Sequence, residues 1–181
     1  MKVSSRQIWL EKGYEMISEH GFIKVKVETI SKAIGKNKSS FYHYFGDWEG
    51  YEEALLNYHL SLTEIFAAKL SKCEEIIPGM INIFLEHKTD IFFHKQLRIN
   101  RAKPNFKKCF EAVFQIFEDT ILEKWKSFIM LQDQPLLASK ILVLISENFL
   151  LRITSENYTY EWMQDYLMEI ANLLGDIKPK S

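Results

Sequence analysis

The eight residues KSSFYHYF, at positions 38–45, place several hydrogen-bond donors on one short segment. Ammonium, hydroxyl and imidazole groups all donate to phosphate oxygens, and an exposed helix that carries them fits the major groove of DNA, where base edges can be read. If the segment is helical, Phe41 and Phe45 lie on one face and can anchor it. The polar residues on the other faces are Lys38, Ser39, Ser40, Tyr42 and His43. The pattern therefore predicts a helix that binds nucleic acid.

The distribution of charge agrees with this interpretation. The chain has 181 residues and a net charge of −1, but residues 1–46 carry eight basic and four acidic side chains, a local charge of +4. The rest carries 15 basic and 20 acidic side chains, a charge of −5. A basic N-terminal quarter favours a polyanionic partner. The alternative is an ordinary three-helix bundle with a solvated polar surface, although tyrosines on both sides of His43 favour binding.

Three helices are expected to position the segment. Apolar spacing predicts helices over Ser4–His20, Val27–Ile34 and Lys38–Phe45. Gly35 can end the second helix and Asn37 can cap the third. Two short helices joined by a tight turn are the layout of a helix-turn-helix.

The two short helices must bury an apolar face against the first helix. Spacing places four residues on that face, and we expect them to pack against Ile17 and Phe22. The four residues are Ile30, Ala33, Phe41 and Phe45. Ala33 is small, which would let two helices cross closely.

The rest of the chain is also predicted to be helical, so the expected fold class is all-α with about nine helices. Apolar residues recur at three- and four-residue spacing nearly throughout, and there are only 7 Gly and 4 Pro. We expect a helix-turn-helix domain of residues 1–46, followed by a larger helical domain of residues 47–181. The further helices are expected at about Asp47–Lys69, Glu75–His87, Thr89–Ile99, Asn105–Leu131, Pro135–Thr154 and Tyr158–Leu174.

Composition and motifs exclude several function classes. The content of 47% hydrophobic and 26% charged residues is typical of a soluble globular protein. No run approaches eighteen apolar residues and Met1–Leu10 lacks a signal-peptide core, so we expect a cytoplasmic protein with no membrane contact. Cys73 and Cys109 show no metal-ligand spacing and are expected as reduced thiols. No P-loop, dinucleotide-binding turn, HExxH or G-x-S-x-G motif appears, so we expect neither an enzyme nor a cofactor.

The stretch from Arg6 to Phe45 resembles the DNA-binding domain of the TetR family of bacterial transcription regulators. Its most specific part is the Y-H-Y-F run behind a small hydroxyl residue. The residues that carry the resemblance are Arg6, Leu10, Glu19, Gly21, Phe22, Ile30, Ala33, Gly35, Lys38, Ser40, Tyr42, His43 and Phe45. The resemblance implies a repressor that binds pseudo-palindromic double-stranded operator DNA as a homodimer. It also implies release from the operator by a small-molecule inducer.

The same resemblance implies roles for individual side chains. The expected base readers are Lys38 and Ser39. The expected phosphate contacts are Ser40, Tyr42 and His43. Further positive charge is expected from Lys26 and Lys36, with Asn37 as the cap of a recognition helix whose N-terminus faces DNA.

Four positions depart from the family pattern. Trp48 stands where a lysine usually contacts the DNA backbone, Lys36 replaces an apolar turn residue, and Val27 replaces a capping hydroxyl residue. Glu28 places an acid near the DNA-facing end of the second helix, where it can accept from cytosine N4 or repel phosphate. The departures motivate an alternative function, a helical sensor or interaction module with weakened or lost DNA binding.

The last two predicted helices are apolar nearly all round, which requires burial on both sides. Either they lie at the centre of one monomer or they pair with a second copy, as the TetR resemblance implies. The expected dimer-interface residues are Leu142, Ile145, Phe149, Trp162, Tyr166 and Ile170.

Aromatic residues of the middle helices either form a core or line the inducer cavity that the resemblance implies. The candidate cavity residues are Phe84, Phe92, Phe93, Phe110, Phe114, Phe117 and Trp125.

One polar group could bind a divalent ion such as zinc. His87, Asp90 and His94 share a helix face at i, i+3 and i+7, provided that no helix break occurs near His87. Exposed polar residues are the ordinary explanation, and we predict no metal site. Arg98 and Arg101 either pair with an acidic ligand or form a solvated face.

Overall fold

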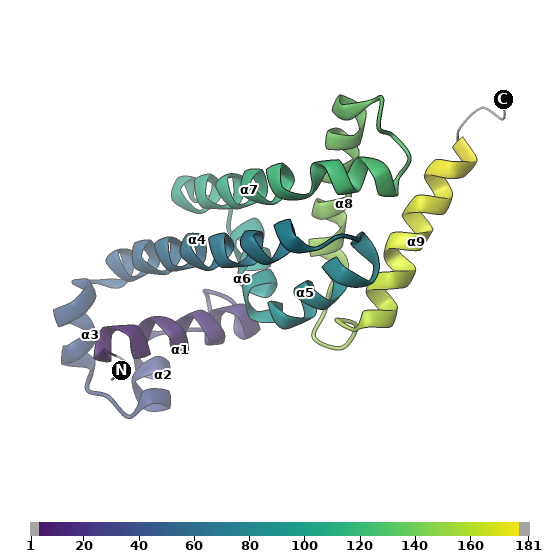
Figure 1. Cartoon of the computed structure of the whole chain (residues 1–181). Helices are drawn as coiled ribbons and strands as arrows, with labels where there is room; N and C mark the ends of the chain where they lie inside the picture. Colours follow the sequence, from purple (N-terminus) through teal and green to yellow (C-terminus); the bar gives the residue numbers. More distant parts are fainter. Residues whose placement is uncertain (1–3, 178–181) are drawn as a thin grey trace. The chain divides into compact units, whose positions relative to one another are not determined.

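The computed structural model describes residues 4–177 and confirms the all-α class. This range folds into nine α-helices and one short π-helical turn, η1, without any strand (Figure 1). The elements are α1 (Ser5–His20), α2 (Val27–Ile34), α3 (Lys38–Phe45), α4 (Trp48–Lys72), η1 (Ile76–Met80), α5 (Ile81–Glu86), α6 (Lys88–Ile99), α7 (Pro104–Phe128), α8 (Pro135–Arg152) and α9 (Tyr160–Ile177). Within the same range, no helix is both long and apolar enough to cross a lipid bilayer.

The chain forms two compact units, and each unit is built from two separate segments of the sequence. Of the described residues, the first unit contains residues 4–64 together with Thr89–Val113, and the second contains Ile65–Lys88 together with residues 114–177. The helices α4 and α7 therefore contribute to both units. The division into domains of residues 1–46 and 47–181 stays a prediction.

Local capping explains why α2 and α3 have the predicted bounds. Gly35 adopts a left-handed conformation with φ of 62°, which a glycine accepts at little cost, and it ends α2. The side chain of Asn37 accepts a hydrogen bond of 2.8 Å from the backbone N–H of Ser39, which satisfies a free donor at the start of α3. At α1, the Ser4 hydroxyl accepts from Gln7 N at 3.2 Å in the same way.

An aromatic cluster forms the core beneath α3. The fully buried ring of Phe41 lies 5.3 Å from the Trp9 ring and 4.9 Å from the Tyr51 ring. The Tyr51 hydroxyl donates to the carbonyl oxygen of Trp9 at 2.6 Å. Gly13 lies against this hydroxyl so closely that a β-carbon at residue 13 would overlap it. The cluster thus joins α1, α3 and α4.

One predicted core residue lies elsewhere. Ile30 is fully buried, whereas Ala33 is exposed. An α-helix turns by about 100° per residue, so Val27, Ile30 and Ile34 fall within about 60° of one another and Ala33 lies a further 60° round. The inward stripe of α2 therefore contains Val27 instead of Ala33.

Two helices that follow α4 differ from the prediction. The expected helix over Glu75–His87 is interrupted at Ile77, inside η1, where the backbone is extended next to Pro78. The last helix begins at Tyr160 and continues through Gly175 to Ile177. A glycine inside a helix costs only about 1 kcal/mol, so Gly175 does not force an end.

The second unit has its own aromatic core. The Phe84 ring lies 5.4 Å from Phe66, 5.9 Å from Phe117 and 5.8 Å from Phe149. The Tyr158 hydroxyl donates to the Phe84 carbonyl oxygen at 2.7 Å, which joins the start of α9 to α5.

Candidate nucleic-acid interface

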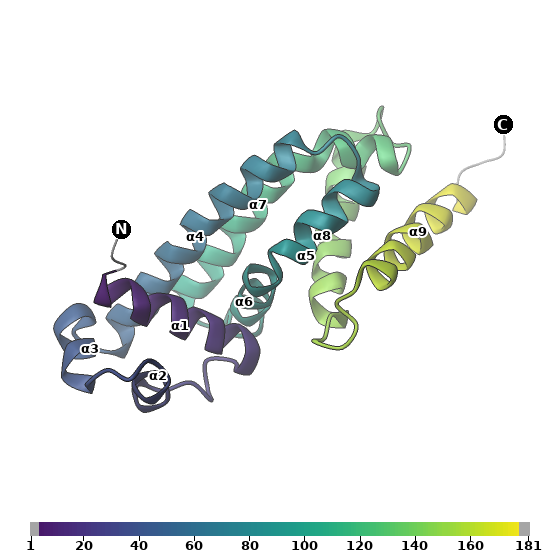
Figure 2. The same ribbon diagram turned by 60° about the horizontal axis from the view of Figure 1, so that its bottom comes forward.

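The three N-terminal helices form a head in which α2 and α3 are joined by the turn at Gly35. Figures 1 and 2 show α3 and α2 packed next to each other and beside α1. This is the arrangement of a helix-turn-helix, in which the second short helix is the one that enters the major groove. We use the term head for α1, α2 and α3 below.

The side of α3 that faces solvent carries most of the predicted binding residues. Phe41 and Phe45 are buried beneath the helix, whereas Lys38, Ser39, Tyr42 and His43 are exposed. Lys26 and Lys36 are exposed just before α2 and α3, and Asn37 is the α3 cap. The surface therefore combines exposed lysines with hydroxyl and imidazole donors over a buried aromatic core.

Ser40 differs from the other members of this set because its hydroxyl is already occupied. It donates to the Asn37 carbonyl oxygen at 2.7 Å and accepts from the indole Nε1 of the fully buried Trp9 at 3.2 Å. A hydroxyl has a single proton, so in this arrangement Ser40 cannot also donate to a phosphate. Its observed contacts link α1 to α3.

A second charged group accompanies Lys38 on the exposed surface. The Glu28 carboxylate, from the first turn of α2, lies 2.9 Å from the Lys38 ammonium at the first position of α3. The hydrogen bond with Lys38 holds the pKa of Glu28 below its usual value, and the same bond raises the pKa of Lys38. Both groups are therefore charged over the whole neutral range.

Sequence reasoning missed two contacts that shape the head, one made by Thr29 and one made by Arg6. Val27 is buried and caps nothing; instead the hydroxyl of Thr29 accepts from Lys26 N at 2.9 Å and donates to Lys26 O at 2.7 Å. The exposed Arg6 places its guanidinium 5.2 Å from the Phe45 ring, beside the end of α3. The serine or threonine preference at helix starts could have identified Thr29, but no local signal pairs Arg6 with Phe45.

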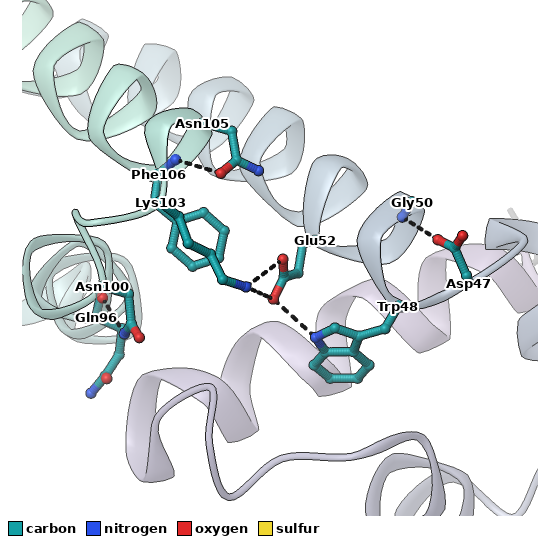
Figure 3. Close-up of polar contacts among 9 residues, drawn as sticks. All are labelled: Asp47, Trp48, Gly50, Glu52, Gln96, Asn100, Lys103, Asn105 and Phe106. Atoms are coloured by element: carbon teal, nitrogen blue, oxygen red, sulfur yellow. Dashed lines mark hydrogen bonds and ion pairs between the residues drawn. The ribbon is translucent and has the colours of Figure 1, made fainter.

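Trp48, which replaces the usual lysine, makes an internal contact. Its indole Nε1 donates to Glu52 at 2.9 Å, and the Lys103 ammonium binds the two oxygens of the same carboxylate at 2.8 and 2.9 Å. Figure 3 shows the indole and the ammonium approaching the carboxylate from two sides. The Glu52 side chain is only 5% exposed, so its charge depends on these partners. Lys103 comes from the turn between α6 and α7 and was not predicted.

A buried polar chain runs through the first unit behind the head. The Tyr14 hydroxyl lies 2.7 Å from His59 Nδ1 and donates to Asp90 at 3.1 Å, and His59 Nε2 lies 3.4 Å from His94 Nδ1. Burial lowers the pKa of His94 to about 3 and holds the pKa of His59 well below its usual value. Burial, followed by the charge of Asp90, raises the pKa of Tyr14. Both imidazoles are thus neutral at physiological pH.

Comparison with known proteins identifies the head. Residues 10–50 match the family described as bacterial regulatory proteins, tetR family. The head belongs to the TetR family. The TetR-type head is a DNA-binding domain, and it marks the chain as a transcription regulator.

The fold of the whole chain has a solved counterpart. The structure of GusR from Salmonella enterica is similar over 98% of each chain, with a TM-score of 0.62 and 13% sequence identity. At this identity the likeness concerns the fold alone. The chain matches no curated protein sequence.

Outside the head, the three candidate metal ligands His87, Asp90 and His94 do not come together as a binding site. The helix breaks at His87, which lies between α5 and α6, so the face expected for the three residues is not continuous. Asp90 accepts from Tyr14, and the His94 ring stacks on Phe110 with centroids 4.5 Å apart. Among the residues that the structure describes, no three metal-ligating side chains come together.

The candidate cavity residues are divided between the two units. Phe92, Phe93 and Phe110 belong to the first unit, where Phe93 is fully buried and stacks on Tyr14 at 4.1 Å. The residues in the second unit are Phe84, Phe114, Phe117 and Trp125. An open groove of about 540 Å³ in the second unit is lined by none of the seven. Their role in ligand binding stays a prediction.

The C-terminal helices expose apolar side chains in addition to the predicted interface residues. Leu142 and Tyr166 are buried within the second unit, and Ile145, Phe149, Trp162 and Ile170 are half-buried. The apolar residues that α8 leaves exposed are Leu136, Leu137, Val143, Leu144 and Leu151. Three of these recur every seven residues, so they follow one side of the helix.

Proposed function

We propose that the protein is a homodimeric transcriptional repressor that binds a pseudo-palindromic operator through α3 and leaves it when a small-molecule inducer binds. The observation that carries the proposal is the exposed polar side of α3, held by the aromatic core of a TetR-type head. The +4 charge of residues 1–46 supports association with a polyanion. In this proposal the protein acts in the cytoplasm and catalyses no reaction.

The exposed leucines of α8 support the dimer. A row formed by Leu137, Leu144 and Leu151 on the surface of a water-exposed helix is unfavourable unless another apolar surface covers it. A second copy of the same helix offers a matching row, because a two-fold interface pairs a surface with itself. The two heads of such a dimer match two half-sites about one helical turn of DNA apart.

Selection of bound duplexes from random DNA tests the proposal directly. The purified full-length protein should enrich an inverted repeat, and the affinity for the best duplex should fall with salt. If each head neutralises about three to five phosphates, the slope of log K against log salt should lie between about −5 and −9. A slope near zero, or no enriched sequence, would contradict the proposal.

A second function is favoured by two specific contacts. Trp48 points its only polar group at Glu52, and Glu28 compensates the charge of Lys38, so two positions that could bind DNA are engaged internally. These contacts suit a sensor or interaction module that has lost its operator. The same selection separates the two functions, because such a module would enrich no sequence.

A further inference from the structure

The ion pair between Glu28 and Lys38 occupies a distinctive place on the head. It joins the first turn of α2 to the first residue of α3, and its side chains are 54% and 51% exposed. An ion pair this exposed adds little to stability, because water screens it. A purely structural role therefore does not account for an acid on a surface that otherwise carries the donors of Lys36, Ser39 and Tyr42.

The pair still has free hydrogen-bonding capacity. The Lys38 ammonium has three N–H groups, and a single one is needed for the 2.9 Å contact with Glu28 Oε1. The second oxygen of the Glu28 carboxylate remains available as an acceptor. Donors and an acceptor thus lie next to each other on the exposed surface, in a relative position fixed by the ion pair.

This pattern is complementary to the major-groove edge of one kind of base pair. Guanine presents two adjacent acceptors, N7 and O6, and its partner cytosine presents the N4 amino donor. An A·T pair presents its acceptors on separate bases, and the thymine methyl group would meet a carboxylate unfavourably. The two free N–H groups of Lys38 match guanine, and the free oxygen of Glu28 matches cytosine.

We propose that Glu28 and Lys38 act together as a specificity-determining pair that reads one G·C base pair in each operator half-site. Lys38 donates to guanine, and Glu28 accepts from cytosine while it fixes the direction of the lysine. The inference rests on the proposed function, because it requires that the N-termini of α2 and α3 face DNA. It makes Glu28 a positive determinant of sequence and not merely a charge that repels phosphate.

The test uses the full-length protein and duplexes obtained by selection from random DNA. The wild type should enrich a G·C pair at one symmetric position of each half-site. Replacement of that pair by A·T should weaken wild-type binding by about 5- to 100-fold, measured by fluorescence anisotropy. In Glu28→Met, which removes the acceptor, and in Lys38→Met the same replacement should change affinity less than threefold. The double variant should lose no more discrimination than either single variant.

Matched variants separate base reading from charge. Glu19→Met and Lys24→Met remove the same charges from exposed positions that lie outside the pair. They should shift the affinity for all duplexes equally and keep the G·C preference. Far-ultraviolet circular dichroism checks that every variant is folded.

Three outcomes would overturn the inference. If Glu28→Met strengthens binding to all duplexes as Glu19→Met does, with the G·C preference retained, Glu28 acts as charge only. If the wild type selects an A·T pair at the position that responds to Lys38→Met, the assignment of the base pair is wrong. If the wild type enriches no sequence, the proposed function fails as well, which distinguishes that result from the first two.

Discussion

The indole Nε1 of Trp9 donates a hydrogen bond of 3.2 Å to the hydroxyl oxygen of Ser40, and this bond joins α1 to α3. Ser40→Ala would leave the buried indole N–H without an acceptor. We therefore expect the free energy of unfolding, measured with urea, to fall by about 1–2 kcal/mol. Ser39→Ala, at the exposed neighbouring position, should change it by less than about 0.5 kcal/mol. Ser40→Ala could instead leave the free energy of unfolding unchanged and make the slope of log K against log salt less steep. A phosphate contact would then be the better assignment for Ser40.

The buried Glu52 carboxylate should be sensitive to the loss of Lys103. In Lys103→Met the carboxylate keeps only the indole of Trp48, so we expect the free energy of unfolding to fall by about 1–3 kcal/mol, a value reduced because Lys103 is half in solvent. Lys107→Met, at an exposed position of α7, serves as the control and should have little effect. If Lys107→Met lowered the free energy of unfolding by the same amount, the effect would come from lost packing of the lysine side chain and not from the buried charge of Glu52.

The neutral pair of His59 and His94 should make the protein sensitive to mild acid. Burial places their folded-state pKa values below the ordinary 6.5, with His94 at about 3, so between these values the unfolded chain binds more protons than the folded chain. The free energy of unfolding should therefore be constant above about pH 7 and fall below pH 6.5, by up to about 1.4 kcal/mol per pH unit for each histidine. Urea titrations at several pH values measure this. His94→Leu should reduce the slope, and an unchanged slope in this variant would contradict the assignment.

The exposed row on α8 should control self-association. Leu144 is 70% exposed, and Leu144→Lys should raise the dimer dissociation constant by at least about tenfold in sedimentation experiments, because a lysine would have to be desolvated in the interface. Ile99→Lys replaces a side chain that is 60% exposed outside α8 and α9, and it should leave the dimer intact. A wild-type protein that remains monomeric at micromolar concentration would refute the dimer itself.

Local signals in the sequence predicted the head closely, whereas contacts between distant residues could not be predicted. The bounds of α2 and α3 were correct because a left-handed glycine and a capping asparagine act within a few residues. The occupation of the Ser40 hydroxyl depends on Trp9, which lies 31 residues away, and no spacing rule connects the two. Lys103 and Glu52 are 51 residues apart and are joined only by the fold.

The remaining errors have equally specific causes. Ala33 was assigned to the core by its spacing, but it lies beyond the edge of the stripe that includes Ile30. The helix expected over Glu75–His87 was interrupted near Pro78, where the preceding residue is restricted to extended angles. The aromatic residues of the middle helices could not be sorted into core and cavity, since both roles need the same side chains.

The close approach of the Tyr51 side chain to Gly13 makes these two positions interdependent in evolution. While position 51 keeps a tyrosine whose hydroxyl reaches the backbone of Trp9, any side chain at position 13 is excluded. A larger residue becomes tolerable only together with a side chain smaller than a phenyl ring at position 51, because the ring carbon Cζ would also lie only 2.8 Å from a β-carbon at residue 13. Divergent relatives of this chain should therefore change the two sites jointly, and a lineage that retains the tyrosine is confined to glycine at its partner site.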